Sequence, residues 1–136
     1  DRRALLEEMT SERPTVESFL QFSFGSCLVD ASTTPMNGFP LSAPVLATWC
    51  LSEYNLAERC EVGIATMEAY QQRGLATLTG RAFLEQAQQK GVRRIGWQCW
   101  KGNAPSVRTA LRLGFRLLGE HPAAVVWRKE TGGRAG

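Results

Sequence analysis

The sequence has few of the side chains that build metal centres and nucleophilic active sites. It contains one histidine, His121, two tyrosines and four cysteines, and no two cysteines stand at C-x-x-C spacing. With a single histidine and no such pair, a zinc site is disfavoured, and we expect no bound metal. No histidine–aspartate partnership supports a cysteine nucleophile either.

The cysteines all lie in apolar stretches that resemble strands. We expect the four of them to be reduced core thiols of a cytoplasmic protein, with a disulfide pair or a reactive thiol as the alternatives. They are Cys27, Cys50, Cys60 and Cys99.

Long apolar runs and dense basic runs are also missing. No stretch approaches the roughly 18 consecutive apolar residues of a membrane span, and the charged segment from Asp1 to Met9 is unlike a signal peptide. The net charge is +3, and the closest basic pairs are Arg2-Arg3 and Arg93-Arg94. This balance predicts neither a membrane nor a nucleic-acid partner, and it suits a small anionic ligand.

What is present fits one globular domain. The chain has 136 residues, of which 43% are hydrophobic and 21% charged, an ordinary size and composition for a single folded unit. We assign residues 1–130 to the domain and the glycine-rich residues 131–136 to a disordered tail. Because the chain begins at Asp1 and not at methionine, it stays open whether an N-terminal region is missing.

Hydrophobic periodicity predicts an α/β fold on a mixed sheet. Helices are expected from Arg2 to Met9, from Thr15 to Phe22, from Leu75 to Lys90 and after Asn103, which would cap its helix. Residues 31–44 are rich in Thr, Pro, Asn and Gly and are expected to form a loop. Strands are expected at Gly25–Asp30, Val45–Glu53, Cys60–Thr66, Val92–Trp100, Phe115–Gly119 and Ala123–Arg128. The short link between the second and third of these favours an antiparallel hairpin.

The stretch Gln71-Gln72-Arg73-Gly74-Leu75-Ala76-Thr77 lies between a predicted strand and a long helix. The first N–H groups of a helix have no internal partner and carry partial positive charge, so a phosphate placed there accepts several of them. Gly74 would let the backbone approach such a ligand closely. The stretch is neither a P-loop nor a G-x-G-x-x-G turn, and the plainer interpretation is that Gly74 only begins a helix.

These residues resemble the GNAT superfamily of N-acetyltransferases. Gln71-x-x-Gly74-x-Ala76 matches that family's Q/R-x-x-G-x-G/A pattern, and the strand before it also resembles the family's. Asn103-Ala104-Pro105-Ser106 followed by Leu113-Gly114-Phe115 resembles a second conserved block. The resemblance covers about residues 45–128. It implies a single GNAT-like domain with a mixed, mostly antiparallel twisted sheet flanked by helices.

The resemblance also implies roles for individual residues. Acetyl-CoA would be the co-substrate, with its pyrophosphate on the N–H groups of residues 72–77 and its pantetheine arm beside Thr66 and Met67. A backbone N–H near Ala65 would polarise the thioester carbonyl, and Asn103 would contact the pantetheine. The cofactor-binding residues are therefore Ala65, Thr66, Met67, Gln71, Gln72, Arg73, Gly74, Leu75, Ala76, Thr77 and Asn103.

Two catalytic roles, the general base and the general acid, each have more than one candidate. Glu61 is the first choice for the base that makes the attacking amine neutral, and Glu53 on the neighbouring strand is the second. Family members often place a tyrosine seven positions after the motif asparagine to protonate the departing thiolate, but that position here is Ala110. Ser106 or a water would have to substitute.

The function expected from this resemblance is transfer of an acetyl group to a primary amine of a small molecule by direct attack. A non-catalytic acyl-CoA-binding or sensing module is the first alternative, because of the missing tyrosine. An interaction domain unrelated to coenzyme A is the second, disfavoured by the thin basic charge. The acceptor is beyond the sequence, and a homodimer is as open as a monomer.

Overall fold

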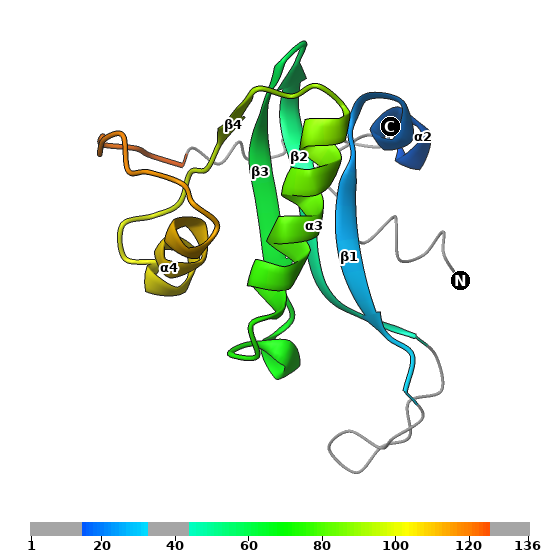
Figure 1. Ribbon diagram of the computed structural model, residues 1–136. Helices are drawn as coiled ribbons and strands as arrows, with labels where there is room; N and C mark the ends of the chain where they lie inside the picture. Colours follow the sequence, from blue (N-terminus) through cyan, green and yellow to red (C-terminus); the bar gives the residue numbers. More distant parts are fainter. Residues whose placement is uncertain (1–14, 33–43, 126–136) are drawn as a thin grey trace, which may run out of the picture.

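The fold is built on a sheet whose strands follow one another in chain order. A computed structural model describes residues 15–32 and 44–125 of the chain. The helix predicted from Arg2 to Met9 and the tail predicted at residues 131–136 lie outside these ranges. The described part forms a four-stranded sheet in the order β1-β2-β3-β4, together with α2 (Val16–Phe22), α3, α4 and a 3-10 turn (Figure 1).

The first three strands form an antiparallel meander. β1 (Gly25–Asp30) pairs with β2 (Val45–Leu56), and β2 pairs with β3 (Arg59–Thr66). The turn between β2 and β3 is tighter than the predicted link, because both strands run on toward it. β4 (Arg94–Gly96) then pairs parallel to β3, so the sheet is mixed and mostly antiparallel, as the sequence predicted.

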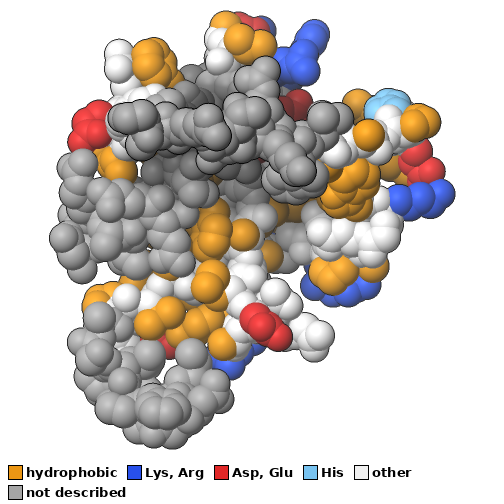
Figure 2. Space-filling model, turned by 180° about the vertical axis from the view of Figure 1, so that it is seen from behind, with side chains coloured by type: hydrophobic (Ala, Val, Ile, Leu, Met, Phe, Trp, Pro, Cys, Tyr) orange, Lys and Arg blue, Asp and Glu red, His pale blue; other side chains and the backbone are white. Residues whose placement is uncertain are grey.

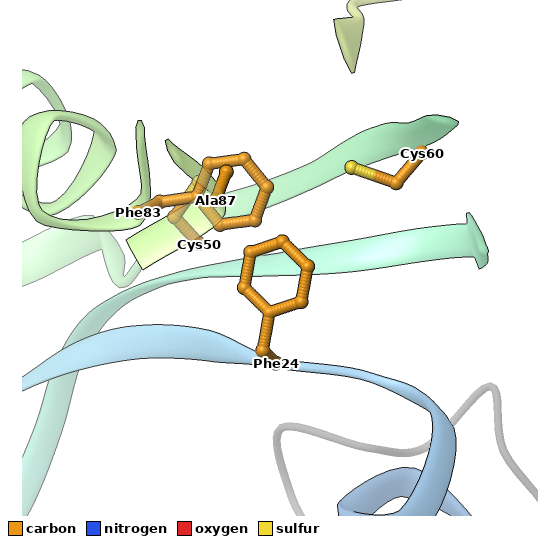
Figure 3. Close-up of a cluster of buried hydrophobic side chains, with 5 residues drawn as sticks. All are labelled: Phe24, Cys50, Cys60, Phe83 and Ala87. Carbon is orange, nitrogen blue, oxygen red and sulfur yellow. The ribbon is translucent and has the colours of Figure 1, made fainter. Parts of the chain in front are cut away.

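Helix α3 (Leu75–Gln89) lies across one face of this sheet (Figure 1). The core between them contains Phe24, Cys50, Cys60, Phe83 and Ala87, and the rings of Phe24 and Phe83 stack with centroids 5.1 Å apart (Figure 3). Burying such side chains contributes about 1.5–3 kcal/mol each. The helix is therefore fixed on the sheet by its apolar stripe, and its N-terminus is fixed with it.

Two glycines set the ends of α3. Gly74 precedes it with φ +74° and Gly91 follows it with φ +77°. Only glycine adopts this left-handed conformation without appreciable cost. The predicted helix from Leu75 to Lys90 agrees with the structure to within a residue at its end.

The strand predicted from Val92 to Trp100 was too long. Only Arg94–Gly96 forms a strand, and residues 97–100 have no regular structure. The pairing of β3 with β4 covers Arg59 to Glu61 and ends there. A strand persists only where a neighbour accepts its hydrogen bonds, so β4 ends where the pairing ends.

Of the two strands predicted after α4 (Ala104–Arg112), the first is not formed, and the second lies partly outside the described residues. Phe115–Gly119 has no regular structure, and neither does the described beginning of Ala123–Arg128. Leu117 and Leu118 are 75% and 93% exposed. Their apolar pattern suggested a strand, but within residues 15–32 and 44–125 no neighbouring strand pairs with this segment.

The cysteine prediction holds for half of the cysteines. Cys50 and Cys60 are fully buried in the core, and burial together with nearby Cys60 and Glu53 raises the pKa of Cys50 to about 12. Cys27 and Cys99 are exposed, so the expectation of four core thiols was wrong for these two. All four are free thiols. None of the described helices is long and apolar enough to cross a membrane.

Candidate functional site

The turn that leads into α3 has an unusual backbone. Gln72 and Gly74 have φ values of +61° and +74°, while Arg73 between them does not have a positive φ. Alternation of this kind turns successive N–H groups toward one side, which makes an anion-binding concavity. A Cβ at Gly74 would have no atom within 4 Å, so the space beside this residue is open.

The N-terminus of α3 has no cap from the described residues. None of their side chains bonds its first N–H groups, and the Leu78 N–H makes the first backbone bond, to the Gly74 carbonyl at 3.2 Å. The N–H groups of residues 75–77 precede that bond, and such groups have no partner within a helix. Residues 71–74 are all exposed. An anion arriving here would therefore find several donors and the positive end of the helix dipole.

The segment between β3 and α3 is tied to the sheet at three points. The Met67 N–H donates to the Ala47 carbonyl at 2.9 Å, and the Gln71 side-chain amide donates to the Thr66 carbonyl at 3.1 Å. The hydroxyl of Tyr70, in the 3-10 turn Glu68–Tyr70, donates to Asp30 Oδ2 at 2.9 Å. Gln71 and the Met67 N–H therefore hold the turn in place, in addition to any contact with a ligand.

Asp30 and Tyr70 form a polar contact at the end of β1. The Ser32 N–H donates to Asp30 Oδ1 at 2.9 Å, and this bond, with the Ser32 and Tyr70 hydroxyls, holds the pKa of Asp30 below its usual range. Burial and the bond to Asp30 raise the pKa of Tyr70. The guanidinium of Arg73 lies over the Tyr70 ring, 5.5 Å from its centroid, so the one cation of the turn rests on this ring.

Part of the β3 edge is left without a neighbour. β4 pairs with β3 only as far as Glu61, so residues 62–66 have no partner strand on that side among the described residues. In an antiparallel pair, residues alternate between bonding their partner and facing away from it. The Met67 N–H bonds the Ala47 carbonyl, so the backbone N–H and C=O groups of the odd-numbered β3 residues point toward β2. Those of the even-numbered residues point toward the open side.

This alternation bears on the oxyanion donor expected near Ala65. The Ala65 backbone faces β2, and its carbonyl accepts a bond from the Thr48 hydroxyl at 2.8 Å. The neighbouring N–H groups of Ile64 and Thr66 are the ones that face the open side. The Thr66 hydroxyl lies 2.9 Å from the Thr48 hydroxyl. Because Thr48 donates to Ala65, Thr66 is the donor in this pair.

Glu61 lies where β3 and β4 separate. Its neighbours Val62 and Cys60 pack on the α3 side, so alternation places Glu61 on the opposite face. Its carboxyl group sits over Gly96, where any Cβ would overlap it. Oε1 is 3.7 Å from the Arg59 guanidinium, while Oε2 is buried and has no hydrogen-bond partner among residues 15–32 and 44–125. A buried carboxylate oxygen that the protein leaves unpaired can still accept a proton or a ligand hydrogen bond.

Glu53, the second candidate base, is directly opposite Glu61 in the β2–β3 register. The two therefore share one face of the sheet. The Glu53 carboxyl lies over Gly63, which again has no room for a Cβ. Figure 2 shows the molecule from the side opposite α3, where hydrophobic side chains also reach the surface. Each of the two carboxyl groups thus lies over a glycine of the neighbouring strand.

Helix α4 brings the remaining candidates together. Asn103 caps the helix, its Oδ1 accepting the Ser106 N–H at 3.3 Å. The Trp97 indole N–H donates to Ser106 Oγ at 3.0 Å, and the indole packs edge-on against Phe115. An indole N–H can only donate, so the Ser106 hydroxyl keeps its own hydrogen for another acceptor. Ala110, at the position where the family often has tyrosine, is buried.

Sequence reasoning missed three features of this site. Neither Asp30 as the partner of Tyr70 nor Trp97 as the partner of Ser106 was expected, since each bond joins side chains of two different segments, whose approach depends on the tertiary fold. The glycines under the two glutamates were also missed. Gly63 and Gly96 each lie within a predicted strand, and these were the available signals, because a strand glycine marks a close approach by another group.

The described fold matches that of solved acetyltransferases. In it, a mixed sheet in which two strands separate places a bare strand edge beside the N–H groups of a helix N-terminus. The model of the GNAT acetyltransferase family matches residues 41–124, which is more than half of the chain. The chain belongs to this family.

Solved structures show the same fold at low identity. Aminoglycoside N-acetyltransferase AAC(6′)-Iy, solved in complex with CoA, is 20% identical with a TM-score of 0.53 over 91% of this chain and 87% of its own. A Trypanosoma brucei acetyltransferase is 13% identical with a TM-score of 0.55, covering 92% and 90%. The Bacillus subtilis protein YycN is a weaker and only partial match, 14% identical with a TM-score of 0.48 over 59% of this chain and 54% of its own, and the fold assignment does not rest on it. No curated protein sequence matches.

Proposed function

We propose that the chain is an acyl-CoA-dependent N-acyltransferase that transfers the acetyl group of acetyl-CoA to a primary amine of a small molecule. The observation that carries the proposal is the uncapped N-terminus of α3 beside the unpaired edge of β3. The helix N-terminus offers N–H donors for the diphosphate of coenzyme A, and the strand edge offers backbone groups that can pair with the amides of its pantetheine arm. Membership of the GNAT acetyltransferase family supports it.

The proposed cofactor contacts follow the turn and the strand. The N–H groups of residues 72–77 bind the pyrophosphate, with Arg73 adding a cation. The pantetheine arm lies along Thr66 and the Met67 side chain, and the Ile64 and Thr66 N–H groups next to Ala65 polarise the thioester carbonyl. Asn103 contacts the arm from α4 while it caps that helix. Charge-assisted hydrogen bonds contribute about 1.5–3 kcal/mol each, so a few of them suffice for micromolar affinity.

The proposed chemistry is a direct attack by the amine nitrogen on the acetyl carbonyl. The nitrogen forms a new bond to the carbonyl carbon, the carbon–sulfur bond breaks, and no acyl group passes through the protein. Glu61 accepts the proton that the amine loses, directly or through a water, and its unpaired Oε2 supports this role. The Ser106 hydroxyl donates a hydrogen bond to the departing thiolate, because Trp97 occupies its oxygen and leaves its hydrogen available. The proton that the thiolate finally takes comes from a water, directly or through this hydroxyl, which recovers its own proton from the water in the same step.

The acceptor we propose is a small-molecule amine, with no metal, nucleic acid or membrane taking part. One structural neighbour is by name an aminoglycoside acetyltransferase, which makes amines of that kind the first to test. The four free thiols favour a reducing compartment such as the cytoplasm. Whether two copies associate as a homodimer is a separate question that gel filtration answers.

A second function is favoured by one observation. Ala110 occupies the position of the family's frequent tyrosine, and Ser106 is a much weaker acid than that tyrosine. A domain that binds acyl-CoA without turning it over, as a sensor, would tolerate this change. It predicts binding of CoA with no thiol release across a panel of amines.

The proposal is tested by ligand-induced stabilisation followed by a thiol-release assay. Acetyl-CoA at about 100 times its Kd should raise the free energy of unfolding by about 2.7 kcal/mol and the melting temperature by on the order of 10 °C. Thiol release with any amine of a panel then separates the enzyme from the sensor. The absence of any shift at millimolar acetyl-CoA would overturn both.

Gly74 offers a matched pair of variants for the same assay. Both Asn and Asp tolerate the left-handed backbone, and there is open space beside Gly74 for either side chain. Gly74→Asp places a carboxylate beside the diphosphate and should abolish the shift, while Gly74→Asn, without the charge, should retain part of it. Equal shifts in the two variants would contradict a diphosphate site at this turn.

A further inference from the structure

The turn that carries the proposed pyrophosphate site is supported from a strand far away in the sequence. Tyr70 is 4% exposed, and its hydroxyl reaches Asp30, the last residue of β1 and 40 positions earlier. β1 is at the opposite edge of the sheet from β4. The Tyr70–Asp30 bond therefore spans from the first strand to the segment that follows the third.

The other two ties do not fix this segment completely. The Met67 N–H bond and the Gln71 side-chain bond both hold it near the end of β3. Between them, Tyr70 is the one buried side chain of the segment from Met67 to Gly74. Beyond Gln71 the chain enters the positive-φ turn directly. The orientation of this turn relative to the sheet is thus set through the buried ring of Tyr70 and its bond to Asp30.

Asp30 is well suited to hold a hydroxyl group. One carboxylate oxygen is fixed by the Ser32 N–H, and the other is left for Tyr70. A hydrogen bond to an ionised acceptor is about twice as strong as one between neutral groups. The Tyr70 ring in turn carries the Arg73 guanidinium on its face. Asp30 thereby holds in place both the backbone donors and the one cation of the turn.

We propose that Asp30 and Tyr70 are positioning residues for the pyrophosphate turn, so that their hydrogen bond raises the affinity for coenzyme A without touching it. This inference rests on the proposed function. Its physical basis is preorganisation: apparent affinity falls in proportion to the fraction of molecules whose binding groups are correctly arranged. Losing the bond lets the turn adopt other arrangements, and each of these lowers that fraction.

The test is the Tyr70→Phe variant, which removes the hydroxyl and retains the ring under Arg73. By calorimetry its Kd for CoA should be about tenfold higher than that of the unsubstituted protein, in line with the loss of a hydrogen bond to a charged group. The Kd for pantetheine, which lacks the diphosphate, should not change in a ligand-observed NMR titration. Asp30→Asn should act in the same direction, and the double variant should be no weaker than the worse single one.

Ser26→Ala is the matched control. The Ser26 hydroxyl also ties β1 to a later element, donating to the Thr79 carbonyl in α3 at 2.8 Å. Its loss should lower the melting temperature while leaving the CoA affinity unchanged. The inference is overturned if Tyr70→Phe binds CoA as the unsubstituted protein does, if Ser26→Ala weakens CoA equally, or if CoA and pantetheine weaken together. Failure of the unsubstituted protein to bind CoA would instead overturn the proposed function.

Discussion

At the scale of single residues, two carboxyl groups compete for the role of base. Glu61 and Glu53 face each other across β2 and β3, and each is seated on a glycine, Gly96 and Gly63 respectively. The buried and unpaired Oε2 of Glu61 favours it. Replacing either glycine by alanine would displace the carboxyl group above it. The choice of base can therefore be tested without substituting either glutamate.

Glu61→Gln should lower kcat by about 100-fold or more while the Kd for CoA stays the same, because general bases contribute about 10²–10⁴-fold to rate. Gly96→Ala should also lower kcat, since its Cβ takes the place of the Glu61 carboxyl group. Steady-state kinetics and calorimetry measure the two quantities. Gly63→Ala, which displaces Glu53 in the same way, is the control and should leave kcat nearly unchanged. The reverse order of the two alanine variants would assign the base to Glu53.

At the scale of elements, one residue at the N-terminus of α4, Asn103, has two roles: it caps the helix, and it is proposed to contact coenzyme A. The Asn103 Oδ1 caps the helix, while its amide N–H₂ is the group proposed to contact the pantetheine arm. Serine also caps helices well but has no amide group, so the two duties can be separated by substitution.

Asn103→Ser should keep the melting temperature close to that of the unsubstituted protein and raise the Kd for CoA several-fold, because the cap is retained and an amide donor is lost. Asn103→Ala should lose both, with a cost of about 1 kcal/mol for the cap. Thermal unfolding and calorimetry report on the two duties separately. If Asn103→Ser binds CoA with unchanged affinity, Asn103 is a helix cap and nothing more.

The elements also show which features a sequence can reveal. The ends of α3 were predictable because Gly74 and Gly91 act locally, and β3 was predictable from the alternation of its side chains. The length of β4 was not, because it depends on where β3 stops pairing, which is a property of the sheet. The apolar residues after Gly114 suggested strands because of their pattern along the chain. Such a pattern does not reveal whether a neighbouring strand is there to pair with.

The candidate site was predictable to a similar extent. The motif from Gln71 to Thr77 located the turn, because its chemistry depends on residues adjacent in sequence. Its support by Asp30 was not visible, since a contact across 40 positions leaves no periodic trace. The same holds for the unpaired Glu61 Oε2, because burial of one atom depends on the packing of several elements.

At the scale of the whole molecule, the cysteines divide into two classes. Cys50 and Cys60 have no exposed surface, and a thiol with a pKa of about 12 supplies almost no thiolate near neutral pH. Cys27 and Cys99 are exposed. Partial burial raises the pKa of the Cys27 thiol, so Cys27 should react with a thiol reagent more slowly.

An aromatic disulfide reagent at pH 8 should therefore label two thiols in the folded protein and four in denaturant. Cys99→Ala should remove one of the two reactive thiols, which identifies the faster site. Rapid labelling of all four in the folded protein would contradict the burial of Cys50 and Cys60. The labelled pair also sets the background of any assay that detects released coenzyme A thiol.

The bare stretch of β3 beyond Glu61 has one further consequence. An unoccupied strand edge is normally a hazard, since it can template aggregation with the edge of another sheet. Here the unpaired stretch, residues 62–66, is short and ends where Glu61 pairs with Gly96. A foreign strand that pairs along it must therefore stop at Glu61, because β4 already takes the hydrogen bonds beyond that point. The edge thus has room for a short extended chain but not for the long strand pairing from which aggregates grow.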